Sequence, residues 1–224
     1  MPIKSIKVIV TGATGMVGEG VMYVCLQNPN IETVLMINRK PCGVVHPKLK
    51  EVIHSDFFDF TAIENELIGY DACFFCLGVS SVGMSADDYY KFTYTLTLNV
   101  AKSLLKANAG ITFSYISGTG TDSTEKSWSR WARVKGKTEN DLMALPFKSV
   151  YAFRPGFIKP IEGMQHTHAF YKYVNWIFPL GRVFYKKAFC TLNELANAMI
   201  FLALTNPKTR VVEGDAIIEF GAKT

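Results

Sequence analysis

A chain of 224 residues, of which 49% are hydrophobic and 19% charged, can bury its own core, which excludes a disordered protein. The net charge of +5 is spread along the chain without a basic run, so it does not indicate nucleic-acid binding and fits a small anionic ligand better. Five cysteines, an odd number, without a recognisable signal peptide predict reduced thiols and a cytoplasmic protein.

The first half of the chain alternates between strand and helix patterns. In chain order we expect strands at 6–10, 33–37, 51–54 and 72–77, a helix at 16–27, and a short helix that opens at the capping box Thr61-x-x-Glu64. The fourth strand contains Cys73 and Cys76. Because residues three apart in a strand point to opposite faces, this CxxC predicts neither a metal nor a redox site.

The first strand leads directly into a glycine loop, Thr11-Gly12-Ala13-Thr14-Gly15-Met16-Val17-Gly18. We expect Gly12 to turn the chain, Gly15 to let the backbone approach a pyrophosphate, and Gly18 to let the helix pack close to the sheet. The N–H groups from Thr14 through Met16 and Val17 would then meet the phosphates at a helix N-terminus. An ordinary strand–helix turn is the alternative, but the place of the loop between a strand and a helix predicts dinucleotide binding.

The residues after the second strand favour NADP(H) over NAD(H). An NAD site usually has an acid about 20 residues after the loop, where this chain has Arg39 and Lys40. A guanidinium can hold a 2′-phosphate, although both residues could simply be solvated. Asp56, after the third strand, is expected to accept a hydrogen bond from the adenine amino group, unless it is only a turn residue. Leu77 and Gly78, after the fourth strand, would line the path of the cofactor.

The second half continues the alternation. We expect helices at 86–107, 129–145 and 191–204, the last opened by the capping box Thr191-x-x-Glu194, and strands at 111–116, 149–153 and 216–220. Such alternation predicts an α/β protein with a single doubly wound parallel sheet, a Rossmann fold with strand order 3-2-1-4-5-6 and helices on both faces. Residues 1–224 are read as one domain.

The segment 156–187 departs from this alternation and is rich in aromatic residues. We expect it to be a substrate-side insertion over the carboxyl ends of the strands, or, with equal weight, a surface that covers the core or a homodimer interface. A membrane-surface role is less favoured because few cations accompany the aromatic residues. No stretch reaches the ~18 apolar residues of a transmembrane helix. His166 and His168, without an acid or cysteine close in sequence, are read as surface or substrate-side residues, so no metal site is expected.

These residues resemble the short-chain dehydrogenase/reductase superfamily, and within it the atypical NAD(P)-binding members, such as the Tat-interacting oxidoreductase-like and NAD-dependent epimerase-like proteins. The segments that carry the resemblance are TGATGMVG (11–18), INRK (37–40), FFCLG (74–78), YISGTGTD (115–122), WARVKGKTEN (131–140) and FRPGFI (153–158). The resemblance covers nearly the whole chain, and the later segments are more specific than the glycine loop.

The resemblance also implies catalytic residues. Members of that superfamily use a Ser that orients the substrate carbonyl, a Tyr that donates a proton, a Lys that holds the nicotinamide ribose, and often an Asn. Position by position these map onto Ser117, Lys135 and Asn99, while Trp131 stands where the Tyr is expected. An indole N–H donates a hydrogen bond but cannot act as a proton donor near neutral pH. Ser117, Lys135 and Asn99 each have a structural alternative, as a strand-end cap, a solvated lysine and a local hydrogen-bonding residue.

Three functions follow as hypotheses. The first is an NADP(H)-binding oxidoreductase-like protein that transfers hydride to or from a small carbonyl or alcohol with an altered proton donor. The second is a catalytically impaired dinucleotide sensor or partner-binding protein. The third is a sugar-nucleotide epimerase or dehydratase, which is disfavoured because it also uses the missing tyrosine.

Overall fold

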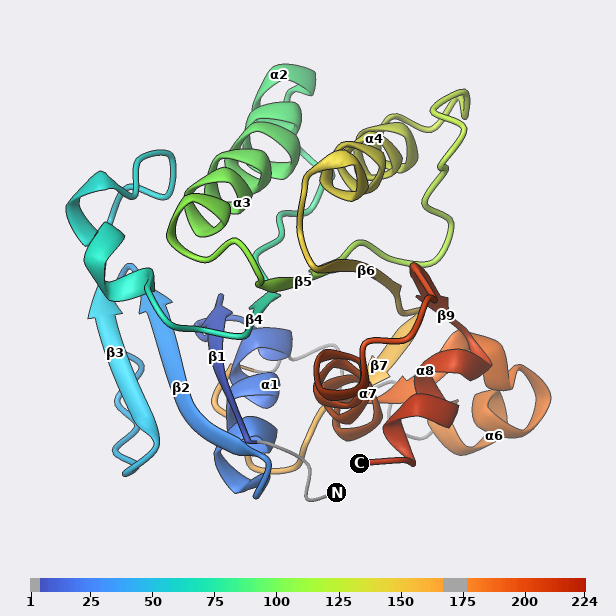
Figure 1. Ribbon diagram of the computed structural model, residues 1–224. Helices are drawn as coiled ribbons and strands as arrows, with labels where there is room; N and C mark the ends of the chain where they lie inside the picture. Colours follow the sequence, from blue (N-terminus) through green and yellow to red (C-terminus); the bar gives the residue numbers. More distant parts are fainter. Residues whose placement is uncertain (1–4, 167–176) are drawn as a thin grey trace.

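The computed structural model describes residues 5–166 and 177–224, and it has the predicted α/β architecture (Figure 1). Within these residues, seven strands form one parallel sheet in the order β3-β2-β1-β4-β5-β6-β9. The predicted order 3-2-1-4-5-6 is therefore confirmed, with one more strand at the edge. The strands are β1 (Ile6–Thr11), β2 (Ile31–Asn38), β3 (Leu49–Ile53), β4 (Ala72–Phe75), β5 (Thr112–Ile116), β6 (Ser149–Arg154) and β9 (Val211–Glu213).

Helices cover both faces of the sheet (Figure 1). One face carries α1 (Met16–Gln27), α7 (Leu192–Thr205) and α8 (Asp215–Gly221). The other carries α2 (Ala86–Tyr90), the π-helical turn η2 (Lys91–Thr95), α3 (Leu96–Ala107) and α4 (Arg130–Ala144), with η1 (Thr61–Leu67) at the edge. α2, η2 and α3 follow one another without a break, as the single helix predicted over 86–107 requires.

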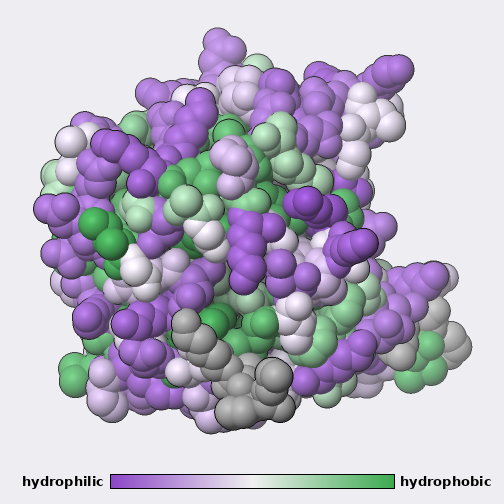
Figure 2. Space-filling model, in the orientation of Figure 1, coloured by the Kyte–Doolittle hydropathy of each residue, from purple (hydrophilic) through white to green (hydrophobic). Residues whose placement is uncertain are grey.

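Each face of the sheet packs its own hydrophobic cluster. The α1 and α7 side is built on residues such as Val8 and Leu195, and the α3 and α4 side on residues such as Ile9 and Leu104. Cys73 of β4 belongs to the second cluster and Cys76, directly after β4, packs against the first, so the two thiols face opposite sides of the sheet as predicted. In the orientation of Figure 1, hydrophilic residues cover the outer edges while hydrophobic residues show mainly toward the middle (Figure 2).

The segment after β6 forms a small unit of its own. It contains β7 (Phe157–Lys159), α6 (Ile177–Phe184), η3 (Lys186–Ala188) and β8 (Phe189–Thr191), and β7 pairs with β8 in a separate parallel sheet. The rings of Phe157, Phe178 and Phe189 pack on one another, with centroids 5.5 to 6.1 Å apart. These aromatic residues therefore build a local core. His168 lies outside the described residues, and the single-domain interpretation stays a prediction.

A predicted strand at 216–220 and a predicted capping box at Thr61 are wrong. Residues 216–220 form most of α8 and not a strand, because Gly214 ends β9 and the ring of Phe220 stacks on Phe201 of α7 with centroids 5.7 Å apart. Thr61 does not cap a helix with its side chain: its hydroxyl and its N–H both donate to Asp59, and η1 is a 3₁₀ helix. The second capping box, between Thr191 and Glu194, is confirmed.

Candidate functional site

The glycine loop joins β1 to α1 in a geometry that two of its glycines require. Gly12 has φ +80°, and a Cβ there would lie 3.0 Å from the carbonyl oxygen of Cys76. A Cβ on Gly18 would collide with the carbonyl of Gly12, so this glycine lets the helix pack against the loop. Gly15 is different, since a Cβ there would meet only the Gly12 oxygen, at 3.5 Å. The backbone at Gly15 is therefore open on its outer side.

The N-terminus of α1 lies at this open position. Gly15 is the N-cap residue, and no side chain of the described residues caps it. The Gly15 N–H donates to the Gly12 oxygen at 2.9 Å, and the first bond within the helix is from Glu19 N–H to the Gly15 oxygen, also at 2.9 Å. The N–H groups of Met16, Val17 and Gly18 therefore have no partner within the helix, which makes this end a place where an anion can bind.

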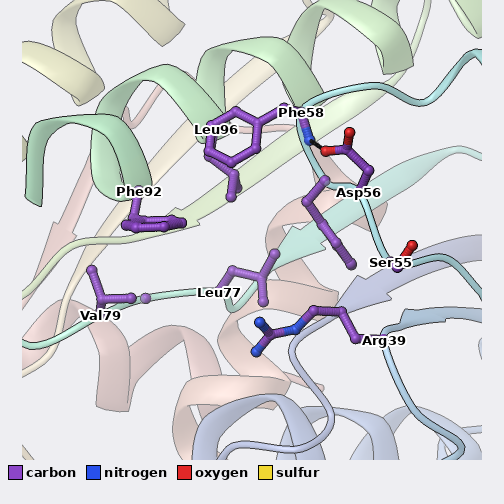
Figure 3. Close-up of a pocket in the computed structure, with 10 residues that line it drawn as sticks. Arg39, Ser55, Asp56, Phe58, Leu77, Val79, Phe92 and Leu96 are labelled. Carbon is purple, nitrogen blue, oxygen red and sulfur yellow. Dashed lines mark hydrogen bonds between the residues drawn. The ribbon is translucent and has the colours of Figure 1, made fainter. Parts of the chain in front are cut away.

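A pocket opens at the carboxyl ends of β2, β3 and β4 (Figure 3). It encloses about 620 Å³, including the space that faces solvent. A smaller hollow adjoins it and shares Arg39, Phe57 and Leu77 with it, so the two form one groove, called here the Arg39 groove. Its lining residues are Gly12, Thr14, Ile37, Asn38, Arg39, Ser55, Asp56, Phe57, Phe58, Leu77, Gly78, Val79, Phe92 and Leu96. The structure thus brings together six residues that the sequence selected, Gly12, Thr14, Arg39, Asp56, Leu77 and Gly78.

The charged groups of the Arg39 groove are not neutralised by one another. Arg39 is exposed and forms no ion pair within the described chain, and in Figure 3 it lies below Leu77, away from Phe92 and Leu96. One carboxylate oxygen of Asp56 accepts the Phe58 N–H at 2.8 Å, which leaves the other available to a donor. Lys40 is exposed as well but lines neither part of the groove.

An acid of the neighbouring strand β3 also lies at this end of β2. Glu51 of β3 accepts the side-chain N–H of Asn38 at 2.7 Å and the backbone N–H of Cys42 at 2.8 Å, both on the same oxygen. Asn38 is 3% exposed, whereas Glu51 itself is exposed to solvent. Because both bonds end on one oxygen of Glu51, they do not exclude a donor at the other oxygen.

Ser117 and Lys135 meet at the end of β5. The Lys135 ammonium donates to the backbone carbonyl of Ser117. Burial lowers the pKa of Lys135 from 10.5 to about 8, and the nearby carboxylate of Glu139 opposes that shift. The Ser117 hydroxyl is 2.5 Å from Glu139 and 3.1 Å from the Phe153 carbonyl, and the residue is 6% exposed. Because a hydroxyl has a single proton, Ser117 cannot donate to Glu139 and to a substrate carbonyl together.

Trp131 and Asn99 are placed differently. Trp131 lies on α4 one turn before Lys135 and covers Gly120, where a Cβ would be 3.2 Å from the indole. Asn99 lies on α3, half-buried, and makes no side-chain hydrogen bond to any residue that the structure describes. The hydrogen bonds thus join Ser117 to Lys135 but connect neither to Asn99.

Three polar residues of this region were not selected from the sequence. Glu139 is 1% exposed and forms an ion pair with Arg154 of β6, which is itself largely buried. Thr119, two residues after Ser117, has an exposed hydroxyl 3.1 Å from the carbonyl of Arg154 and lines a hollow beside Gly120. The spacing of Lys135 and Glu139 signals only a surface pair on one helix, and nothing local points to Arg154.

His166 is tied to the helix that follows the glycine loop. Glu19, in the first turn of α1, accepts the N–H groups of Gln165 and His166, both at 2.8 Å, and lies 2.9 Å from the His166 ring nitrogen Nδ1. Glu19 is 3% exposed. Sequence reasoning, which looked for an acid close in the chain, missed this partner because it comes from a different part of the fold.

Comparison with known proteins gives a family and a set of relatives. The model of the NAD dependent epimerase/dehydratase family matches residues 8–126. The chain is 24% identical over 229 residues to the protein "FMP52, mitochondrial" of Meyerozyma guilliermondii, covering 94% of this chain and 93% of the relative. It is 29% identical over 151 residues to "FMP52-1, mitochondrial" of Scheffersomyces stipitis, covering 66% of each. That match, and one to the Candida glabrata protein covering 61% of its length, span slightly less than two thirds of those relatives.

Solved structures share the fold. L-sorbose reductase from Gluconobacter frateurii, complexed with NADPH and L-sorbose, superposes with a TM-score of 0.64 at 14% identity, covering 98% of each chain. UDP-N-acetylglucosamine 4-epimerase from Methanobrevibacter ruminantium M1 gives 0.64 at 17% identity, covering 93% of this chain and 76% of that one. These likenesses support the Rossmann fold. The sequence identities are too low to assign the substrates of those proteins to this chain.

The prediction of a cytoplasmic protein is wrong, because several relatives are named as mitochondrial proteins. The odd cysteine count and the lack of a recognisable signal peptide, which led to that prediction, do not distinguish one compartment inside a cell from another. Among the described helices, none is long and apolar enough to cross a membrane.

Proposed function

Since the chain belongs to the NAD dependent epimerase/dehydratase family, we propose that it binds NADP(H) in preference to NAD(H) and acts as an oxidoreductase-like protein. The reaction is hydride transfer to or from a small carbonyl or alcohol, with an altered proton donor at Trp131. The observation that carries the proposal is the Arg39 groove, which runs from the glycine loop to Asp56 at the carboxyl edge of the sheet.

The groove offers a matching group for each part of a dinucleotide. The first-turn N–H groups of α1, with Gly15 open beside them, suit a pyrophosphate. Arg39 suits a 2′-phosphate, since its guanidinium carries two parallel donors and no carboxylate competes for it within the described chain. Phe58, Phe92 and Leu96 provide apolar walls for a base, and the second oxygen of Asp56 an acceptor for its amino group.

At the other end of the site, a nicotinamide cofactor would supply or take up the hydride when bound. Lys135 would hold the ribose, and Trp131 would contribute a hydrogen-bond donor but no transferable proton. The hydroxyl of Ser117 donates to Glu139 and that of Thr119 donates to the carbonyl of Arg154, so either residue polarises the substrate oxygen only after its hydroxyl turns away from that partner. The proton then comes from water or from a group on the substrate.

Cofactor selectivity tests this proposal. NADPH is expected to bind more tightly than NADH, and Arg39→Ala should weaken NADPH by about 1.5–3 kcal/mol, the range for a hydrogen bond to a charged group, while leaving NADH nearly unchanged. The matched control is Lys40→Ala, which removes a neighbouring cation outside the groove and should have a much smaller effect. Calorimetric titration of the four combinations gives the answer. Equal affinities for the two cofactors in the unmutated protein would contradict the preference for NADP(H).

A second function is favoured by the same region. Trp131 removes the proton donor and Glu139 occupies the Ser117 hydroxyl, so the chain could bind the dinucleotide without turnover, as a sensor or partner-binding protein. The epimerase hypothesis is disfavoured, because it requires the tyrosine that Trp131 replaces. A homodimer also stays a proposal, which sedimentation of the purified protein would test.

A further inference from the structure

We propose that Glu139 is a positioning residue: from its buried place between Arg154 and Ser117, it holds Lys135 in the charged form on the carbonyl of Ser117. The inference rests on the proposed function in one respect, that Lys135 is the residue which meets the cofactor. Glu139 itself touches neither cofactor nor substrate, and it acts through the lysine one helical turn before it.

The geometry joins three elements of the fold at one carboxylate. One oxygen of Glu139 accepts the Ser117 hydroxyl at 2.5 Å and the Arg154 Nε at 3.1 Å. The other accepts a terminal N–H of Arg154. Lys135 donates to the backbone carbonyl of the same serine. Ser117 is thus held from both sides by two residues of α4, and Arg154 fixes the carboxylate from β6.

The charges in this cluster have opposite effects on Lys135. Burial lowers the pKa of Lys135 to about 8, and the negative charge of Glu139 opposes that shift. The pKa of Arg154 is raised, first by its hydrogen bond to Glu139, so its positive charge is permanent. Glu139 is 1% exposed, and its ion pair with Arg154 offsets only part of its charge at the lysine. Loss of either partner exposes the lysine to the charge of the other.

Other ionisable groups lie around the cluster. Burial raises the pKa of Tyr115 on β5 well above its usual value, and burial also raises that of Tyr89 on α2, so both are neutral. Asp122, in the loop before α4, has its pKa lowered to about 2 by hydrogen bonds from Thr124 and Ser127, so it is always charged. Glu213 of β9 lies 3.8 Å from Arg154 and is more than half exposed.

The test is the titration of Lys135 in two single variants. Lysines are labelled biosynthetically with ¹³Cε-lysine and followed by ¹H–¹³C NMR from pH 6 to 11, and the spectrum of Lys135→Arg assigns the Lys135 signal. We expect a midpoint near pH 8 in the native protein. Glu139→Gln should lower it by about one pH unit, because a unit charge a helical turn away in a protein interior has that order of effect. Arg154→Gln should raise it.

If Glu139 and Arg154 only stabilised the fold, their two single variants would not shift the Lys135 midpoint in opposite directions. Asp141→Asn is the matched control, since Asp141 lies on the same helix but pairs with Tyr94 and Lys137. The Lys135 midpoint in this variant should equal that in the native protein. If Glu139→Gln does not fold, Arg154→Gln and the double variant Glu139→Gln/Arg154→Gln still test the inference. The Lys135 midpoint of the double variant should lie between those of the two single variants.

Two results overturn the inference: an unchanged Lys135 midpoint in the single variants, or a shift of the same sign in both. A second measurement separates it from the proposed function. NADPH affinity should fall as pH rises through the Lys135 midpoint, and this fall should move with the midpoint in each variant. If the midpoints move as expected and the affinity does not follow them, the role of Lys135 in cofactor binding fails while the role of Glu139 stands.

Discussion

Trp131→Tyr is expected to raise or create carbonyl reductase activity. The substitution places a phenol one helical turn before Lys135, whose positive charge favours the phenolate and so prepares the group for proton transfer. General acid catalysis contributes about 10²–10⁴-fold in rate, and a gain of that order over the native protein is expected. NADPH oxidation across a panel of small aldehydes, ketones and quinones measures it.

Trp131→Phe is the matched control for that experiment. It removes a similar volume from above Gly120, where the indole packs, but adds no acid. Unfolding by urea should be followed for both variants, because each leaves a void where the indole was. A fast native enzyme whose turnover survives Trp131→Phe would show that the acid lies elsewhere. No activity in native or Trp131→Tyr protein would favour the sensor.

Gly15→Val is expected to abolish dinucleotide binding while leaving the fold intact. A Cβ at this position meets only one atom within 4 Å, so the loop can accept a side chain, but the branched chain would fill the space outside the first-turn N–H groups of α1. The loss of two hydrogen bonds to a charged phosphate, at about 1.5–3 kcal/mol each, corresponds to at least a ~100-fold loss of affinity. Calorimetry with NADPH measures it, and circular dichroism checks the fold.

Gly18→Ala provides the contrast. Its methyl group would collide with the Gly12 carbonyl, so this variant should lose stability as well as binding. Unchanged NADPH affinity in Gly15→Val would remove the loop from the site. A Gly15→Val protein that unfolds as readily as Gly18→Ala would show that the loop is tighter than its geometry implies.

The parts of the fold that local pattern decides were predictable. The helix at 16–27 matches α1 at both ends, since the glycine loop starts it and Asn28-Pro29 stops it. The two capping-box motifs show the limit of such signals. Thr191 and Glu194 form the box, whereas Thr61 donates to Asp59, an equally local partner that the motif does not exclude. Which of two neighbouring polar groups forms the hydrogen bond depends on local geometry, which the sequence motif alone does not determine.

Some parts of the candidate site were likewise predictable from the sequence, and others were not. Gly12, Arg39, Asp56 and Leu77 follow strand ends, and the carboxyl ends of parallel strands meet at one edge of the sheet, so their convergence in the Arg39 groove was predictable. The direction of the Ser117 hydroxyl was not, because it depends on Glu139 and on Arg154, which is 37 residues away from Ser117 along the chain. The partner of His166, Glu19, is likewise separated from it by most of the chain. Long-range polar pairs of this kind leave no local pattern.

The central claim is that this edge of the sheet binds NADP(H), and a crystal structure of the protein with NADP⁺ tests it most directly. We predict electron density for the pyrophosphate at the N–H groups of Met16 and Val17, for the 2′-phosphate within hydrogen-bond distance of Arg39, and for the adenine between Asp56 and Phe92. The ribose of the nicotinamide should lie at Lys135, with Trp131 close by. Density for the dinucleotide at another place on the molecule, or none from crystals grown at saturating NADP⁺, would contradict the account.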